Sequence, residues 1–121
     1  MTERKNKKSA KSWWEKIDSG GVSEEEINAS YQLAQIDSGG KNIELAILRL
    51  ENLVERSLPN PSRWHVLVHY QLAIYYQELG KFEEAYQHYF EVKSHPPQEG
   101  MEEYREIAEE SALLIESYLA N

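Results

Sequence analysis

Residues 75–92 read YYQELGKFEEAYQHYFEV, and they contain the end of one helix, a turn and most of a second helix. Gly80 stands where a left-handed C-terminal cap is expected, since glycine adopts positive φ without steric cost. Apolar residues recur on both sides of it at the spacing of a helical face. The pattern predicts one helix over residues 62–79 and another over residues 82–93.

Three further helices are expected from similar patterns. The first begins after Ser23, which has the spacing of a capping box with Glu26, and it ends at Gly39. The second covers residues 42–57 and stops before a proline-rich loop, and the last covers residues 101–119. No alternating strand pattern occurs. The predicted fold class is therefore all-α, with antiparallel neighbours joined by short loops.

Each helix has an apolar face that is predicted to point inward. The expected inward residues are Ile27, Tyr31, Leu33 and Ala34 in the first helix, Ile43, Ala46, Ile47, Leu50, Leu53 and Val54 in the second, and Tyr104, Ile107, Ala108, Leu114, Ile115 and Tyr118 in the last.

The chain resembles itself at a spacing of 39 residues. Six pairs keep this spacing through a turn: Leu33 and Leu72, Ala34 and Ala73, Ile43 and Phe82, Ala46 and Ala85, Leu50 and Tyr89, Leu53 and Val92. Chance similarity rarely keeps its register across two helices and a turn, so one helix-pair unit is used twice.

The second unit resembles the tetratricopeptide repeat, whose pattern is W-x₂-L-G-x₂-Y, A-x₃-F and then P. Its matching residues are His69, Leu72, Ala73, Tyr76, Ala85, Tyr89 and Pro97. The first unit matches at Ser30, Leu33, Ala34, Ala46 and Leu50, but it has Asp37 where the pattern has an aromatic residue.

The resemblance covers roughly residues 23–119. It implies about two antiparallel helix–turn–helix repeats in a right-handed superhelical stack. The last helix begins like a third unit, with Tyr104, Ile107 and Ala108, and would act as a C-terminal capping helix. The repeat spacing exceeds the usual 34 residues, and the loop LPNPSR accommodates the difference.

Charge divides the chain into two expected regions. Residues 1–18 are predicted to be a basic, disordered tail with a tryptophan-containing docking segment, and residues 19–121 a tetratricopeptide-like domain. Residues 1–16 hold six Lys/Arg and two Glu, whereas residues 17–121 hold seven Lys/Arg and nineteen Asp/Glu. The acidic body should repel nucleic acid and anionic lipid, which leaves only the tail to attract them.

The tail leaves two questions open. Trp13 and Trp14 either fold back onto the first repeat and cover its edge, which we favour, or anchor into a partner. The basic residues before them either hold nucleic acid, an anionic membrane or the acidic body, or simply keep the chain in solution. The absence of cysteine, of a long apolar run and of a secretory signal predicts a cytoplasmic protein without a membrane span.

Candidate chemistry is sparse. His65 and His69 have the i, i+4 spacing of two metal ligands, but a third ligand would have to come from afar, for instance His88 or a glutamate. His69 also occupies a packing position of the repeat, so no metal or cofactor is expected. Glutamate pairs on helix surfaces indicate solvated faces, and no nucleophile or phosphate-binding motif occurs. We therefore expect no enzymatic activity.

In the tetratricopeptide family, the first helix of each pair lines a concave surface. This resemblance assigns a partner-binding groove to Asn28, Tyr31, Gln32, Gln35, Leu67, Tyr70, Gln71, Ile74 and Arg105. Four of these, Tyr31, Gln32, Tyr70 and Gln71, stand where some relatives carry a carboxylate clamp of Lys, Arg and Asn, so that binding mode is not expected.

The expected function is non-catalytic: an adaptor or regulatory module that presents this groove to a peptide or helix of a protein partner. Two alternatives remain, a self-association module that forms a homodimer and a peptide- or effector-sensing regulator of transcription.

Overall fold

The structure is a computed structural model that describes residues 22–56 and 58–120. Within these residues it contains five helices and no strand: α2 (Glu24–Gly39), α3 (Ile43–Glu55), α4 (Arg63–Glu78), α5 (Phe82–Ser94) and α6 (Glu102–Ala120). The predicted all-α fold class is confirmed, and each helix lies within two residues of its expected bounds. The tail proposed for residues 1–18 lies outside the described residues.

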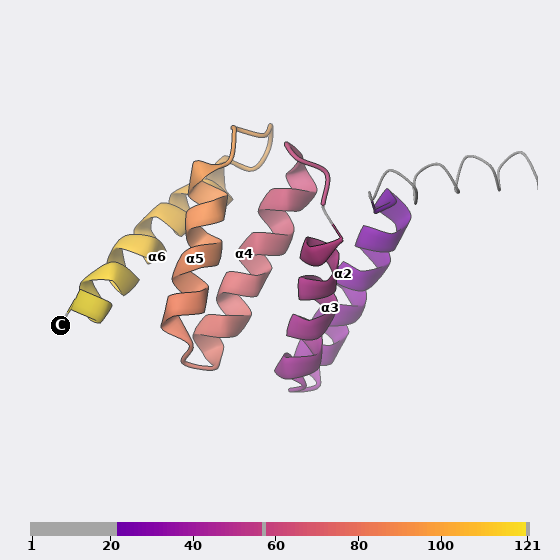
Figure 1. The fold of residues 1–121 in the computed structure, drawn as a ribbon, viewed down its shortest axis with the longest axis horizontal. Coiled ribbons are helices and arrows are strands. Elements are labelled where there is room, and N and C mark those ends of the chain that lie inside the picture. The colour runs from indigo at the N-terminus through magenta and orange to yellow at the C-terminus, as the bar shows by residue number, and fades with distance from the viewer. Residues whose placement is uncertain (1–21, 57, 121) are drawn as a thin grey trace, which may run out of the picture.

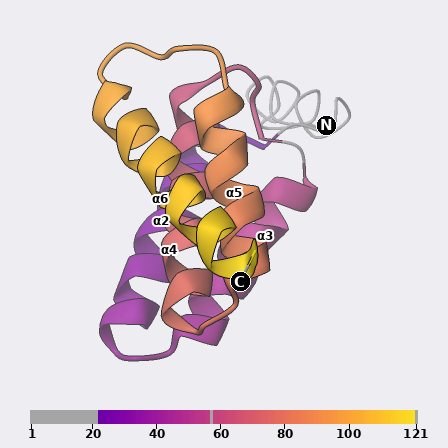
Figure 2. The same ribbon diagram turned by 90° about the vertical axis from the view of Figure 1, so that its left-hand side faces the viewer.

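The helices lie side by side in a row, with consecutive helices running in opposite directions (Figure 1). The closely packed pairs are α2 with α3, α4 with α5 and α5 with α6, while α3 and α4 share a smaller contact. Seen from the α6 end, α6 crosses the helices behind it obliquely (Figure 2). It also contacts α4, its neighbour but one in the chain. None of the described helices is both long and apolar enough to cross a bilayer.

The helix ends follow the capping rules that the sequence predicted. The Glu26 backbone N–H donates to Ser23 Oγ at 3.2 Å, and the Ser23 N–H donates to Glu26 Oε1 at 3.4 Å, which completes the capping box of α2. Val22 and Ile27, on either side of the box, are buried in the same core cluster. Gly80 follows α4 with φ of 80°, the left-handed conformation expected there.

The capping box supports a first prediction. Replacing Ser23 by Ala should lower the free energy of unfolding by about 1 kcal/mol, because the Glu26 N–H loses its acceptor. Ser23→Asp keeps an oxygen acceptor and should retain most of that stability. Urea unfolding followed by circular dichroism measures both changes. If the two variants were equally destabilised, the hydroxyl would not be acting as a cap.

The core divides into two clusters that meet at α4. One cluster joins α2, α3 and α4, and the other joins α4, α5 and α6. In most of the residue pairs that are 39 positions apart, the two side chains are buried to a similar degree. Both alanine pairs, Ala34 with Ala73 and Ala46 with Ala85, are fully buried. Small side chains at these positions let the helices approach closely, and larger residues fill the space beside them.

The structure corrects four expected core residues at the two ends of the row. Leu33 is 43% exposed, because α2 packs mainly on α3 and no other described helix covers that side. On α6, Ile107, Leu114 and Tyr118 are 37%, 73% and 64% exposed. They share a stripe turned away from the buried face, which is formed by Ala108, Ala112 and Ile115.

Asp37, the residue that departs from the aromatic pattern, has its own structural partner. Its carboxylate lies 2.6 Å from Arg49 Nε of α3, and its side chain is 16% exposed. The matching residue 39 positions later, Tyr76, instead donates a hydrogen bond to Glu51 of α3. An ion pair thus links α2 to α3, whereas a tyrosine links α4 to α3.

Candidate functional site: a tyrosine-lined surface

Three tyrosines come from alternate helices, Tyr31 from α2, Tyr70 from α4 and Tyr104 from α6. Tyr31 and Tyr70 are 39 residues apart, and Tyr70 and Tyr104 are 34 apart. The rings of Tyr70 and Tyr104 meet edge-to-face with centroids 4.8 Å apart. All three side chains are half-buried, so each has one side on the core and one in solvent. We call these three residues the tyrosine surface.

Tyr31 is held in place from α4. Its ring lies edge-on to that of Trp64, with centroids 5.7 Å apart, and Trp64 Nε1 donates to Glu24 Oε2 at 3.3 Å. Burial raises the pKa of Tyr31 to about 12, and the hydroxyls of Tyr104, Tyr75 and Tyr70 add smaller contributions. Burial likewise raises the pKa of Tyr70, with help from Tyr104 and Glu103. These phenols therefore stay protonated near neutral pH and can both donate and accept hydrogen bonds.

Six of the other seven predicted groove residues lie on the same two helices as Tyr31 and Tyr70. On α2, Asn28, Gln32 and Gln35 are exposed, and Gln32 Nε2 donates to Asn28 Oδ1 at 3.3 Å. On α4, the half-buried residues are Leu67, Gln71 and Ile74. Solvent-facing amides beside aromatic edges offer donors and acceptors for backbone groups and apolar area for side chains.

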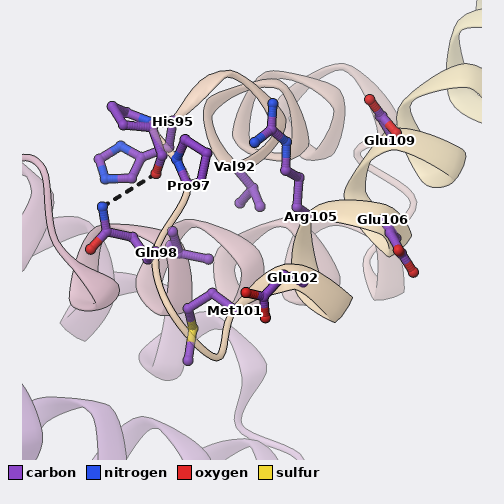
Figure 3. A pocket seen from close by; sticks show the side chains of 11 residues that line it. Val92, His95, Pro97, Gln98, Met101, Glu102, Arg105, Glu106 and Glu109 are labelled. Atoms are coloured by element: carbon purple, nitrogen blue, oxygen red, sulfur yellow. Dashed lines mark hydrogen bonds between the residues drawn. The ribbon is translucent and has the colours of Figure 1, made fainter.

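Arg105, the last predicted groove residue, lies elsewhere. It lines a cavity of about 390 Å³ between the segment after α5 and the start of α6, and no other predicted groove residue lines that cavity. In Figure 3, Arg105 lies above Met101 and Glu102, with Glu106 and Glu109 farther along α6. A dashed line marks the bond from Gln98 Nε2 to the Pro96 carbonyl, which is 3.3 Å long.

Comparison with protein-family models, with curated proteins and with solved structures finds no match. The function of this surface is therefore argued from its own geometry.

Sequence reasoning missed one member of the tyrosine surface and one residue that supports it. Tyr104 was expected only to point inward, and its half-buried ring packs against the second core cluster and also against Tyr70. Trp64 was not singled out, although it packs against Tyr31. The spacing of 34 residues from Tyr70 to Tyr104, the usual repeat length, was the pattern that could have placed Tyr104 here. Trp13 and Trp14, the expected anchor, lie outside the described residues.

A second group of polar residues gathers between α4 and α5. It holds all four histidines of the chain: His65 and His69 of α4, His88 of α5, and His95 just after α5. Ring centroids lie 4.4 Å apart for His65 and His69, 4.2 Å for His65 and His95, and 5.0 Å for His69 and His88. We call these four residues the histidine cluster. Since imidazole nitrogens are metal ligands, this cluster is where the chain could hold a metal ion.

Proposed function

We propose that this chain is a tetratricopeptide-like module of about two repeats and a C-terminal helix, and that it binds a protein partner without catalysing a reaction. The observation that carries the proposal is the tyrosine surface. Tyrosines at repeat-length spacing occur on α2, α4 and α6, the helices that would be the first helix of each unit. Large amphipathic rings that are partly exposed are favoured at protein interfaces.

The partner chemistry follows from the side chains around the tyrosines. The amides of Asn28, Gln32 and Gln71 can pair with the backbone of an extended segment or with polar residues of a helix. Glu24 accepts a hydrogen bond from Trp64, and Glu103, which precedes Tyr104 in the sequence, contributes to the raised pKa of Tyr70. Charge complementarity therefore favours a neutral or basic partner segment.

Self-association remains the second candidate, because α6 exposes a set of large apolar side chains. Leu113, Leu114 and Tyr118 are each more than 60% exposed. A group of such residues on the last described helix favours a contact between two copies.

The test places a photoreactive amino acid at Gln32 or Gln71, both near the tyrosines, and at Glu83 on α5 as a control. Full-length protein carrying each probe is irradiated in lysate of the source cell, and light scattering gives the mass of the purified protein. We expect the same partner to be cross-linked from Gln32 and Gln71 but not from Glu83, with a monomeric mass. Gln32 and Gln71 are polar and at least partly exposed, so both probes should leave the fold intact.

Three other outcomes would count against this proposal. Equal cross-linking from Glu83 would mean that the tyrosine surface is not the binding site. Cross-links only between copies, together with a dimeric mass, would favour self-association. Failure of both surface probes to cross-link any protein would remove the support for a binding role.

A further inference from the structure

The histidine cluster contains a set of potential metal ligands that comes from two helices. His65 and His69 lie one turn apart on α4, and Glu91 comes from α5. One ligand atom from each of the three lies within 4.8 Å of the other two, and Glu91 Oε1 is 3.3 Å from His65 Nε2. Metal–ligand bonds of about 2.0–2.1 Å in tetrahedral geometry need ligand atoms roughly 3.3 Å apart. Glu91 Oε1 and His65 Nε2 already meet this spacing, and the Glu91 side chain, which is 54% exposed, can rotate toward His69.

A hydrogen bond orients His69 in a form that can bind a metal. Glu51 Oε2 lies 3.5 Å from His88 Nε2, an ion-pair contact that favours the tautomer with hydrogen on that nitrogen. In that tautomer His88 Nδ1 is an acceptor, and it lies 2.8 Å from His69 Nδ1, which then donates. The lone pair of His69 is then on Nε2, where it can bind a metal. Metal-ligating histidines almost always donate their other ring N–H to an acceptor, which here is the His88 ring.

His95 differs from the proposed ligands in its hydrogen bonding. Its Nε2 accepts a hydrogen bond from the Ser62 N–H at 3.0 Å, so that nitrogen is already used.

The site also has access to solvent. His65 and His69 line a cavity of about 310 Å³ together with Val54, Leu58 and Asn60. An ion can enter by this route, and a water molecule can complete the coordination beside the three protein ligands.

We infer that His65, His69 and Glu91 form a binding site for one divalent transition-metal ion, of which Zn²⁺ fits best. Two imidazole nitrogens and one carboxylate are a known ligand set for zinc with one position left for water. Nitrogen ligands disfavour Mg²⁺ and Ca²⁺, which prefer oxygen. This site is independent of the tyrosine surface, and its test does not depend on a protein partner.

The test uses the full chain, free of any histidine tag and stripped of metal with a chelator. Isothermal titration at pH 7.5 should show saturable binding of one Zn²⁺ per chain and no binding of Mg²⁺. Zn²⁺ should raise the melting temperature, and a chelator should reverse the change. Co²⁺ in place of Zn²⁺ should give visible absorption bands typical of four- or five-coordinate cobalt.

Glu91→Gln is the decisive variant, because Glu91 is largely exposed and its loss should not affect folding. It should weaken Zn²⁺ binding by about tenfold or more. Glu83→Gln, an exposed change of the same charge on the same helix, should leave the affinity unchanged. His65→Gln should lower the affinity further. Absence of saturable Zn²⁺ binding, or equal affinities for the wild-type, Glu91→Gln and Glu83→Gln proteins, would overturn the assignment.

Discussion

Replacing Leu72 by Ala should lower the free energy of unfolding by about 2–5 kcal/mol. Leu72 of α4 is fully buried in the first core cluster, which also holds Leu50 and Leu53 of α3. The substitution removes three buried carbon atoms, which costs their transfer free energy and leaves a cavity that tightly packed helices close only in part. The effect should be large because this cluster joins α4 to the α2–α3 pair.

Leu33 provides the matched control, because it is the residue 39 positions earlier and undergoes the same chemical change. It is 43% exposed, so Leu33→Ala should cost less than about 1 kcal/mol. Urea unfolding, followed by far-ultraviolet circular dichroism, measures the free energy of unfolding of the two variants. We expect their m-values to be equal. Equal losses would mean that another part of the full chain covers Leu33.

Replacing Ala85 by Leu should cost about 1–3 kcal/mol for the opposite reason, since it adds volume where none is free. Ala85 is fully buried on α5, in the same cluster as Ala73 of α4 and Ala108 of α6, which are also fully buried. Small residues at these fully buried positions of α4, α5 and α6 indicate that the helix backbones lie close together. A leucine there must force the helices apart or adopt a strained rotamer.

Ala29→Leu is the control for this substitution, because Ala29 is exposed on α2. Leucine and alanine both favour helices, so the control should change stability by no more than about 0.5 kcal/mol. Thermal unfolding of the two variants measures the difference. An unchanged melting temperature for Ala85→Leu would contradict the packing observed between α4, α5 and α6.

The candidate surface was predictable only in part. Tyr31 and Tyr70 were assigned to it through the resemblance to the tetratricopeptide repeat, in which the first helix of each pair lines the concave surface, and both are half-buried. Arg105 was misplaced relative to them, since its neighbours depend on how α6 crosses the preceding helices. The place of Tyr104 beside Tyr70 was not predicted for the same reason. The angle at which two helices cross depends on which of their side chains interlock, and the periodicity of the sequence does not determine that angle.

Local sequence patterns were sufficient to predict the five described helices, the capping box of α2 and the small residues at buried helix contacts. These depend on interactions between residues a few positions apart, such as Ser23 with Glu26, or on a repeated spacing. The packing of the helices was needed to show which apolar residues are covered at the ends of the row, as Leu33 and Leu114 show. That packing also brings Glu91 and His88 of α5 to His65 and His69 of α4. Burial and the grouping of ligands depend on side chains from neighbouring helices, which lie far apart in the sequence, so local patterns do not reveal them.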